Sequence, residues 1–262
     1  NIISEYAPPI QITQTLSPDS IYKVSNNTYV FDLGQNMVGW AKLKVRGNKG
    51  DTIRMRFAEV LLPDGNISTI NLRKAKATDY YILRGKGEEI FEPHFTYHGF
   101  RYVEVSSIKY HPDKSTITGC VFHTNNPVSG SFICSNKMVN KLWENITWGE
   151  RGNLESIPTD CPQRDERLGW MGDAQTFWRT ASYNRNMATF THKWTRDIRE
   201  AQSSEGFYSD VSPRVIDKSD GAPGWADAGV IVPYTGFHQY GDVRIILENW
   251  KAMNKYLQTI YK

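Results

Sequence analysis

The hydrophobic pattern of this 262-residue chain changes its period once, and that change restricts the fold more than any other feature. Up to about residue 125, apolar and polar residues alternate, as in segments 41–46 and 53–57, which is typical of half-buried strands. Beyond Asn126-Pro127, apolar residues recur every three or four positions, which is typical of amphipathic helices. The sequence therefore predicts a β domain, residues 1–126, followed by an α domain, residues 127–262.

Turn-forming residues divide the first part into short strands. Glycine, asparagine and aspartate are concentrated in segments 47–51 and 63–66, between apolar runs. The strand-like segments are 28–33, 41–46, 53–57, 79–83, 101–105 and 116–122. Several short half-buried strands separated by turns predict an antiparallel β-sandwich.

The second part has the spacing of five helices. Ser135 is the expected N-cap of the first helix, and the second is expected to start near Asp173. The others are expected near residues 187–201, 230–237 and 242–262, with a long loop at 206–224. The last helical pattern has no glycine or proline stop signal. We therefore expect a truncated chain that contains only the first part of a larger helical domain.

Composition excludes several functions. The net charge of +3, without a lysine- and arginine-rich run, argues against nucleic acid, and no apolar stretch approaches a membrane span of about 20 residues. Cys120, Cys134 and Cys161 lack the spacing of a zinc site or a disulfide framework. The lack of a disulfide framework and of a visible signal peptide slightly favours a cytoplasmic location. No metal or cofactor is predicted, and the oligomeric state stays open. Aromatic residues, 13% of the chain, suit both sugar binding and a large core.

Segment 160–173 concentrates the residues that suggest chemistry. Glycoside hydrolysis needs one carboxyl group that donates a proton and a second carboxylate that activates water or attacks the sugar. Glu166 has other carboxylates nearby in sequence and Trp170 about one turn away, and such surroundings raise a carboxyl pKa. A solvated loop of paired charges has the same composition, so spacing alone does not decide between the two interpretations. The charged residues of this segment are Asp160, Arg164, Asp165, Glu166, Arg167 and Asp173.

The same segment closely resembles the signature loop of the bacterial α-L-rhamnosidases of glycoside hydrolase family 78. Flanking residues resemble that family too, namely Phe177-Trp178, segment 223–228 and segment 231–234. Segments 31–40 and 98–102 are similar to its concanavalin-like domain. The resemblance covers essentially the whole chain. It implies a concanavalin-like β-sandwich, residues 1–126, followed by an incomplete (α/α)6-barrel, residues 127–262.

The resemblance also implies roles for individual residues. Glu166 matches the general acid of the family, and Asp165 beside it is a candidate for tuning its pKa. The residues that match the sugar pocket are Asp160, Arg164, Trp170, Asp173 and Trp225. The family is inverting and uses a glutamate base late in the barrel, so the base is expected beyond this chain and the fragment is expected to be inactive alone. The implied partners are rhamnose-containing glycosides, without a cofactor.

Two other classes of function stay open. A non-catalytic carbohydrate-binding module would use the same aromatic residues and hydroxyl-binding carboxylates without needing Glu166 as an acid. Another (α/α)6-barrel enzyme, either a hydrolase of a different sugar or a lyase, would share the helical pattern. The acidic loop disfavours a lyase, because it would repel an anionic uronate sugar. Glu59 and Asp32 have no chemical context in the sequence.

Overall fold

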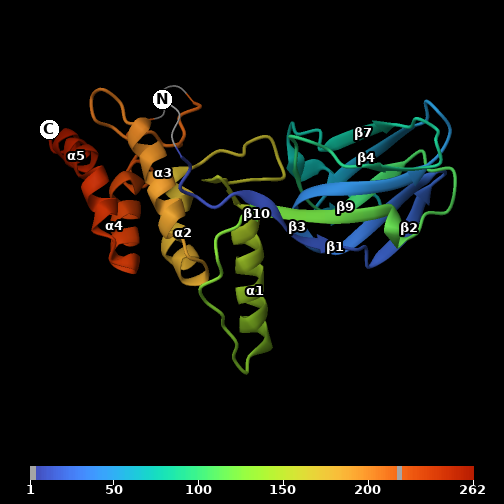
Figure 1. Ribbon diagram of the computed structural model, residues 1–262, viewed down its shortest axis with the longest axis horizontal. Coiled ribbons are helices and arrows are strands. Elements are labelled where there is room, and N and C mark those ends of the chain that lie inside the picture. Colours follow the sequence, from blue (N-terminus) through green and yellow to red (C-terminus); the bar gives the residue numbers. More distant parts are fainter. Residues whose placement is uncertain (1–3, 217–219) are drawn as a thin grey trace. The chain divides into compact units, whose positions relative to one another are not determined.

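The computed structural model describes residues 4–216 and 220–262, and these residues form two compact units (Figure 1). The sheet unit contains Gln11–His123 together with the loop Cys161–Arg167. The helical unit contains the N-terminal segment up to Ile10, Thr124–Asp160 and Leu168–Lys262. One short loop within the helical part of the sequence therefore belongs by its contacts to the sheet unit. The domain boundary at 126/127 stays a prediction.

The sheet unit contains one curled antiparallel sheet of eight strands (Figure 1). Its spatial order is β1-β10-β3-β9-β4-β7, and β2 and β8 also pair with β3. The strands are β1 (Ile10–Leu16), β2 (Ser20–Ser25), β3 (Thr28–Arg46), β4 (Thr52–Ala58), β7 (Thr78–Ile82), β8 (Glu88–Phe91), β9 (His98–Ser106) and β10 (Ile117–Thr124). The short elements β5 (Val60–Leu61), β6 (Ile67–Ser68), η1 (Ile70–Leu72) and η2 (Lys114–Thr116) lie in the connections.

Strand β3 organises the sheet, because it pairs with β2, β8, β9 and β10. Segments 28–33 and 41–46, predicted as separate strands, are the two ends of this one strand of 19 residues. The register shifts between Asp32 and Met37, so the strand continues through a local irregularity. Gly39 of β3 lies so close to the neighbouring strand β10 that a Cβ atom there would lie 1.9 Å from the carbonyl oxygen of Cys120.

The predicted alternation places the apolar residues of β3 and β4 in the core. Leu43, Val45, Met55 and Phe57 are at most 1% exposed, whereas the residues between them are partly accessible. Because successive side chains of a strand point to opposite faces, this pattern buries one face and leaves the other in contact with water. The β plus α architecture predicted from the change of period is therefore confirmed.

The helical unit contains five helices among the described residues, at the places that the apolar spacing predicted. They are α1 (Lys137–Gly152), α2 (Met171–Asn184), α3 (Ala188–Glu200), α4 (Ala228–Tyr240) and α5 (Val243–Ile260), and a short hairpin of β11 (Leu154–Glu155) and β12 (Ile157–Pro158) follows α1. The prediction of Ser135 as the N-cap of the first helix was wrong. Asn136 is the N-cap, and its side chain accepts the backbone N–H groups of Met138 and Val139. Helix α2 begins at Met171, two residues before Asp173.

An aromatic core holds α2 and α3 together. Trp178 and Trp194 stack with their ring centroids 4.9 Å apart, and both are almost fully buried. The indole N–H of Trp178 donates to Thr191, and that of Trp194 donates to the backbone oxygen of Ser212. Hydrogen bonding of these polar edges allows two large rings to be buried without an unpaired donor. These two tryptophans therefore belong to the core of the helical unit.

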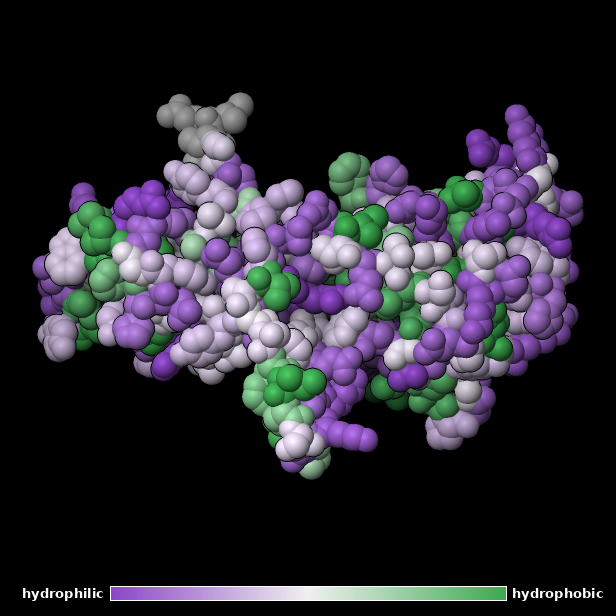
Figure 2. Space-filling model, turned by 60° about the horizontal axis from the view of Figure 1, so that its bottom comes forward, coloured by the Kyte–Doolittle hydropathy of each residue, from purple (hydrophilic) through white to green (hydrophobic). Residues whose placement is uncertain are grey.

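Apolar side chains also remain exposed on the helices. Met138 and Leu142 of α1, and Leu247 and Trp250 of α5, are more than half exposed. Figure 2 shows hydrophobic residues lying among hydrophilic ones on the molecular surface. In the part of the chain that the structure describes, no helix combines the length and apolar character that a membrane span requires.

The predicted loop at 206–224 lies between α3 and α4, and its residues 217–219 fall outside the described residues. Its residues 210 and 212 contact the start of α2. Ser212 donates its backbone N–H to Gly169, and Met171 donates to Asp210. These bonds position the first turn of α2, where two of the predicted site residues lie.

Candidate active site

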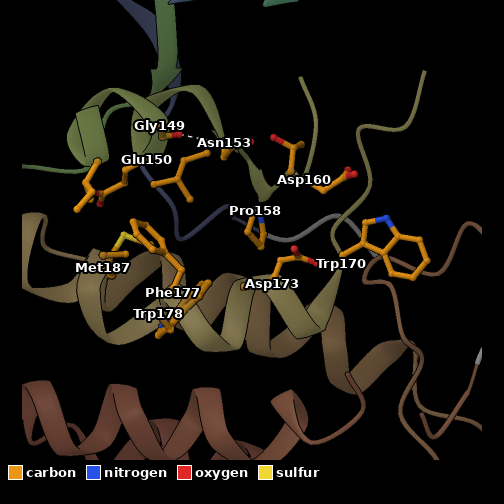
Figure 3. A pocket seen from close by; sticks show the side chains of 15 residues that line it. Gly149, Glu150, Asn153, Pro158, Asp160, Trp170, Asp173, Phe177, Trp178 and Met187 are labelled. Carbon is orange, nitrogen blue, oxygen red and sulfur yellow. Dashed lines mark hydrogen bonds between the residues drawn. The ribbon is translucent and has the colours of Figure 1, made fainter. Parts of the chain in front are cut away.

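A cavity of about 310 Å³ lies within the helical unit, between α1, the β11–β12 hairpin and α2 (Figure 3). Three of the predicted site residues line one end of it, namely Asp160, Trp170 and Asp173. Glu150 and Met187 line the other end. The remaining lining is mainly apolar, with a few polar groups, which is the usual composition of a small-molecule site.

Asp160 and Asp173 reach the cavity from different elements. Asp173 lies in the first turn of α2, where the partial positive charge of the helix end favours a carboxylate. Trp170 is the N-cap residue of this helix and makes no side-chain capping hydrogen bond. Asp160 follows the hairpin, and its Oδ1 atom accepts the backbone N–H of Leu168 at 2.8 Å. The backbone N–H of Asp160 donates to the oxygen of Leu168, so the two residues close the base of the loop between them.

Trp225 lies beside this end of the cavity without being among the residues that line it. Its indole packs on Gly172, where a Cβ atom would lie only 2.9–3.0 Å from three ring atoms. The ring is 39% exposed, so one part of it is available to solvent. Asp227 holds the turn before α4, because it accepts the N–H of Gly224 and the hydroxyl of Tyr256. Asp227 therefore has a structural role.

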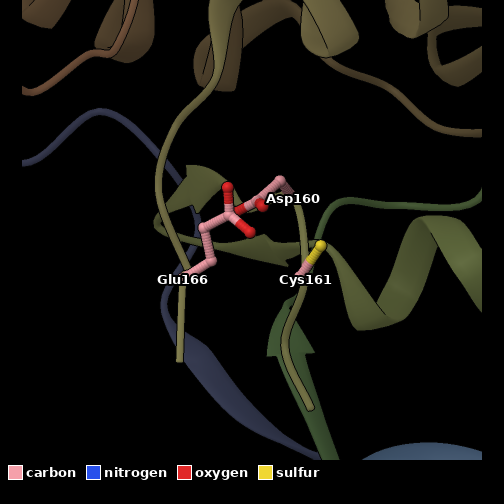
Figure 4. Close-up of side chains that lie close together, drawn as sticks. All are labelled: Asp160, Cys161 and Glu166. Atoms are coloured by element: carbon pink, nitrogen blue, oxygen red, sulfur yellow. The ribbon is translucent and has the colours of Figure 1, made fainter. Parts of the chain in front are cut away.

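The other predicted site residues belong to the sheet unit. Glu166 lies on the loop Cys161–Arg167, and its Oε2 atom is 2.8 Å from Nη1 of Arg73 and 3.0 Å from Nη2 of Arg164. Asp165 contacts the same arginine, with its Oδ1 atom 3.3 Å from Nε of Arg73. Figure 4 shows the Glu166 carboxylate with the thiol of Cys161, whose nearest ligand atoms lie within 4.8 Å of each other.

Two guanidinium groups contact the Glu166 carboxylate within the sheet unit. They belong to Arg73 and to Arg164, a residue of the same loop. Arg73 also contacts Asp165, the carboxylate next to Glu166 in the sequence. Charge-assisted contacts of this kind attach the acidic residues of the loop to the rest of the sheet unit.

Sequence reasoning missed Arg73. This residue precedes Glu166 by 93 positions and follows η1, a short helix that no periodic pattern announced. No local signal identifies it, because most arginines are exposed at the protein surface and have no special role.

Sequence reasoning also missed Glu150, which is only 2% exposed at the far end of the cavity. Burial raises the pKa of Glu150 to about 7, against the opposing effects of Asn184 and Arg185. Its Oε2 atom accepts the amide N–H of Asn184 at 2.9 Å, and its Oε1 atom is 3.9 Å from Nε of Arg185. A glutamate on an otherwise amphipathic helix gives no sign in the sequence that it faces inward.

Comparison with known proteins identifies both parts of the chain. Residues 127–262 match the model of the bacterial α-L-rhamnosidase six-hairpin glycosidase domain, and residues 22–123 match that of the bacterial α-L-rhamnosidase concanavalin-like domain. An α-L-rhamnosidase of Streptomyces avermitilis is 46% identical over 261 residues, and one of Formosa agariphila is 45% identical over 230 residues. The alignments cover 100% and 87% of this chain but 25% of each relative, so the chain spans about a quarter of their length.

Solved structures agree with this result. The S. avermitilis α-L-rhamnosidase complexed with L-rhamnose matches 98% of this chain, and 25% of its own, with a TM-score of 0.96 and 46% identity. The α-L-rhamnosidase of Dictyoglomus thermophilum matches 98% of this chain, and 29% of its own, with a TM-score of 0.95 and 44% identity. The family model for the helical domain covers more than half of the residues of this chain. The aligned relatives cover the remaining residues as well. The chain therefore belongs to the bacterial α-L-rhamnosidase family.

Proposed function

We propose that the protein containing this chain hydrolyses terminal, non-reducing α-L-rhamnose from rhamnosides, with Glu166 as the general acid. The observation that carries the proposal is that one chain segment holds the required groups. Asp160, Trp170 and Asp173 line one end of a cavity, and the loop that leaves at Asp160 and returns at Leu168 carries Glu166. The names of the relatives, and the L-rhamnose bound to one of them, support this substrate class.

The roles follow from the chemistry of a neutral sugar. Asp160 and Asp173 would accept hydrogen bonds from rhamnose hydroxyls, and charged acceptors form stronger hydrogen bonds than neutral ones. Trp170 and Trp225 would cover the apolar C–H face of the ring. Arg164 would brace the loop, because it already contacts Glu166. The acidic character of this set suits an uncharged substrate and disfavours an anionic one.

We propose an inverting reaction. The carboxyl proton of Glu166 would pass to the glycosidic oxygen as the bond to the anomeric carbon breaks. A second carboxylate would remove a proton from water, which attacks the opposite face, and the two carboxyls would stand roughly 6.5–9.5 Å apart. No residue was assigned as this base, and we propose that it lies outside the chain. Arg73 and Arg164 would stabilise the carboxylate that forms when Glu166 gives up its proton.

The test compares leaving groups in the full-length product of the gene that encodes this chain. Glu166→Gln should lower kcat/KM about 10²–10⁴-fold on an alkyl α-L-rhamnoside, whose poor leaving group needs a proton. The loss should be much smaller on p-nitrophenyl α-L-rhamnoside, because p-nitrophenolate leaves without full protonation. Glu144→Gln is the matched control, since Glu144 is an exposed glutamate paired with Lys141 on α1.

Three outcomes would overturn the proposal in different ways. Hydrolysis of other glycosides, but not of rhamnosides, would reject the substrate. Equal losses on both leaving groups would reject Glu166 as the acid. Rhamnose binding by calorimetry without any turnover of the full-length protein would favour a carbohydrate-binding module. The 262-residue chain alone should bind rhamnosides only weakly and should not hydrolyse them, because it lacks an assigned base.

A further inference from the structure

An arginine of the sheet unit holds both acidic residues of the loop that carries Glu166. Arg73 places Nη1 at 2.8 Å from Oε2 of Glu166 and Nε at 3.3 Å from Oδ1 of Asp165. The two contacts use different nitrogen atoms of one planar guanidinium group, so they restrict the direction of the Glu166 carboxylate as well as its distance. A lysine ammonium could supply the charge but not this two-point geometry.

The backbone of Arg73 supports a special role for this residue. It has φ 56° and ψ −113°, and residues other than glycine rarely adopt a positive φ. Such a conformation costs of order 1–3 kcal/mol and persists only where the surrounding structure enforces it. Residues strained in this way are concentrated at functional sites. At this position the strained residue is the one that contacts Glu166.

The short helix η1 that precedes Arg73 is itself anchored. Leu72 is 1% exposed and fixes η1 to the core of the sheet unit. Asn71 donates its side-chain N–H to Oε2 of Glu59 at 2.7 Å, and Asn36 donates to Oε1 of the same carboxylate at 2.9 Å. Glu59, which had no context in the sequence, therefore connects η1 to β3. This arrangement gives Arg73 a fixed base from which to reach the loop.

The loop is attached to the sheet unit at other points as well. Arg167 donates to the backbone oxygen of Tyr97 at 2.9 Å, and its guanidinium lies 4.2 Å from the centre of the Tyr97 ring. Gln163 packs on Gly99 so closely that a Cβ atom at Gly99 would lie 2.8 Å from the Cβ of Gln163. These contacts hold the loop ends, whereas Arg73 contacts the carboxylate that would do the chemistry.

We propose that Arg73 is a positioning residue for Glu166. This inference rests on the proposed function, since it assigns Arg73 a role through the proposed acid. Arg73 would orient the Glu166 carboxyl toward the glycosidic oxygen and stabilise the carboxylate left after proton transfer. The charged and titratable groups facing Glu166 in the sheet unit include Arg73, Arg164, Asp165 and Cys161. Removing Arg73 therefore leaves one of the two cations.

The experiment uses the full-length enzyme and the variants Arg73→Gln and Arg73→Lys. Arg73→Gln should lower kcat at least tenfold and leave KM within about twofold, because a misdirected catalytic group slows chemistry without weakening sugar binding. Arg73→Lys should recover part of kcat, because it keeps the positive charge but not the two-point geometry.

A control and a double mutant separate positioning from folding. Arg84→Gln is the matched control, because Arg84 is an exposed sheet-unit arginine that pairs with a different glutamate, Glu89. Circular dichroism and thermal unfolding should show all variants folded. In a Glu166→Gln background, Arg73→Gln should cause no further loss of kcat, since its effect passes through that carboxyl.

Each result either supports or overturns the inference. An unchanged kcat in Arg73→Gln, while Glu166→Gln is impaired, would refute the role of Arg73 and leave the proposed function intact. Additive losses in the double mutant would show a merely structural effect and would also overturn it. Full activity of Glu166→Gln on the alkyl rhamnoside would instead reject the proposed acid itself.

Discussion

Replacing Glu150 by glutamine should remove a pH dependence from the stability of the helical unit. Burial raises the pKa of Glu150 from 4.5 to about 7, so the folded state binds this proton more tightly than the unfolded state. The free energy of unfolding of the wild type should therefore fall as the pH rises from about 4.5 to about 7, and then level off. Between pH 5 and pH 8 the two pKa values correspond to a loss of about 2–3 kcal/mol.

The replacement keeps the shape of the side chain and its acceptor for the Asn184 amide but has no titrating proton. The difference in unfolding free energy between Glu150→Gln and wild type should thus move by about 2–3 kcal/mol in favour of the variant from pH 5 to pH 8. Arg185 faces a neutral side chain in the variant at every pH and in the folded wild type below about pH 7, so its attraction is already contained in the pKa of Glu150.

Urea unfolding followed by tryptophan fluorescence suits this measurement, because seven of the eight tryptophans belong to the helical unit and only Trp40 to the sheet unit. Glu144→Gln, at an exposed position of the same helix, serves as the control and should show no such change. A difference between Glu150→Gln and wild type that stays constant from pH 5 to pH 8 would refute the reasoning, since it would mean that Glu150 titrates alike in both states.

Two further substitutions test the packing around the sheet and the sugar pocket. Asp32→Asn should destabilise the sheet unit at neutral pH by about 1–3 kcal/mol, because Arg101 donates two hydrogen bonds to the Asp32 carboxylate. Burial alone would raise the Asp32 pKa, but these bonds lower it overall, so the difference from wild type should shrink as the pH falls below about 4 in thermal unfolding followed by circular dichroism. Gly172→Ala should force the Trp225 indole to move and raise KM for a rhamnoside several-fold in the full-length enzyme. An unchanged KM would show that Trp225 does not contact the sugar.

Periodicity predicted most elements because each needs only local information. The five helices among the described residues lie where apolar residues recur at three and four positions, and the predicted strand segments overlap β3, β4, β7, β9 and β10. Strands β1, β2 and β8 were not predicted. Asn136 and Ser135 are both good N-caps, and only the path of the backbone selects one. Segments 28–33 and 41–46 belong to one strand, β3, which continues through a register shift.

The candidate site was predictable only in part. Family resemblance pointed to the residues of the acidic loop and to Trp225, and their roles stay predictions. The contact of Glu166 with Arg73 was not predictable, because the two residues are 93 positions apart in the sequence. Glu150 was missed because burial depends on what packs against a helix, and a lone glutamate in a helical pattern is normally exposed.

The sequence by itself determined the order of β and α structure, the family and the segment that carries the candidate chemistry. These features depend on the spacing of residue types along the chain. Only the tertiary structure decided that this segment is shared between two units, with Glu166 held by Arg73 in the sheet unit while Asp160 and Asp173 line a cavity in the helical unit. Electrostatic and hydrogen-bonding interactions act over a few ångströms in space, so contacts between residues far apart in the chain appear only when the fold brings them together.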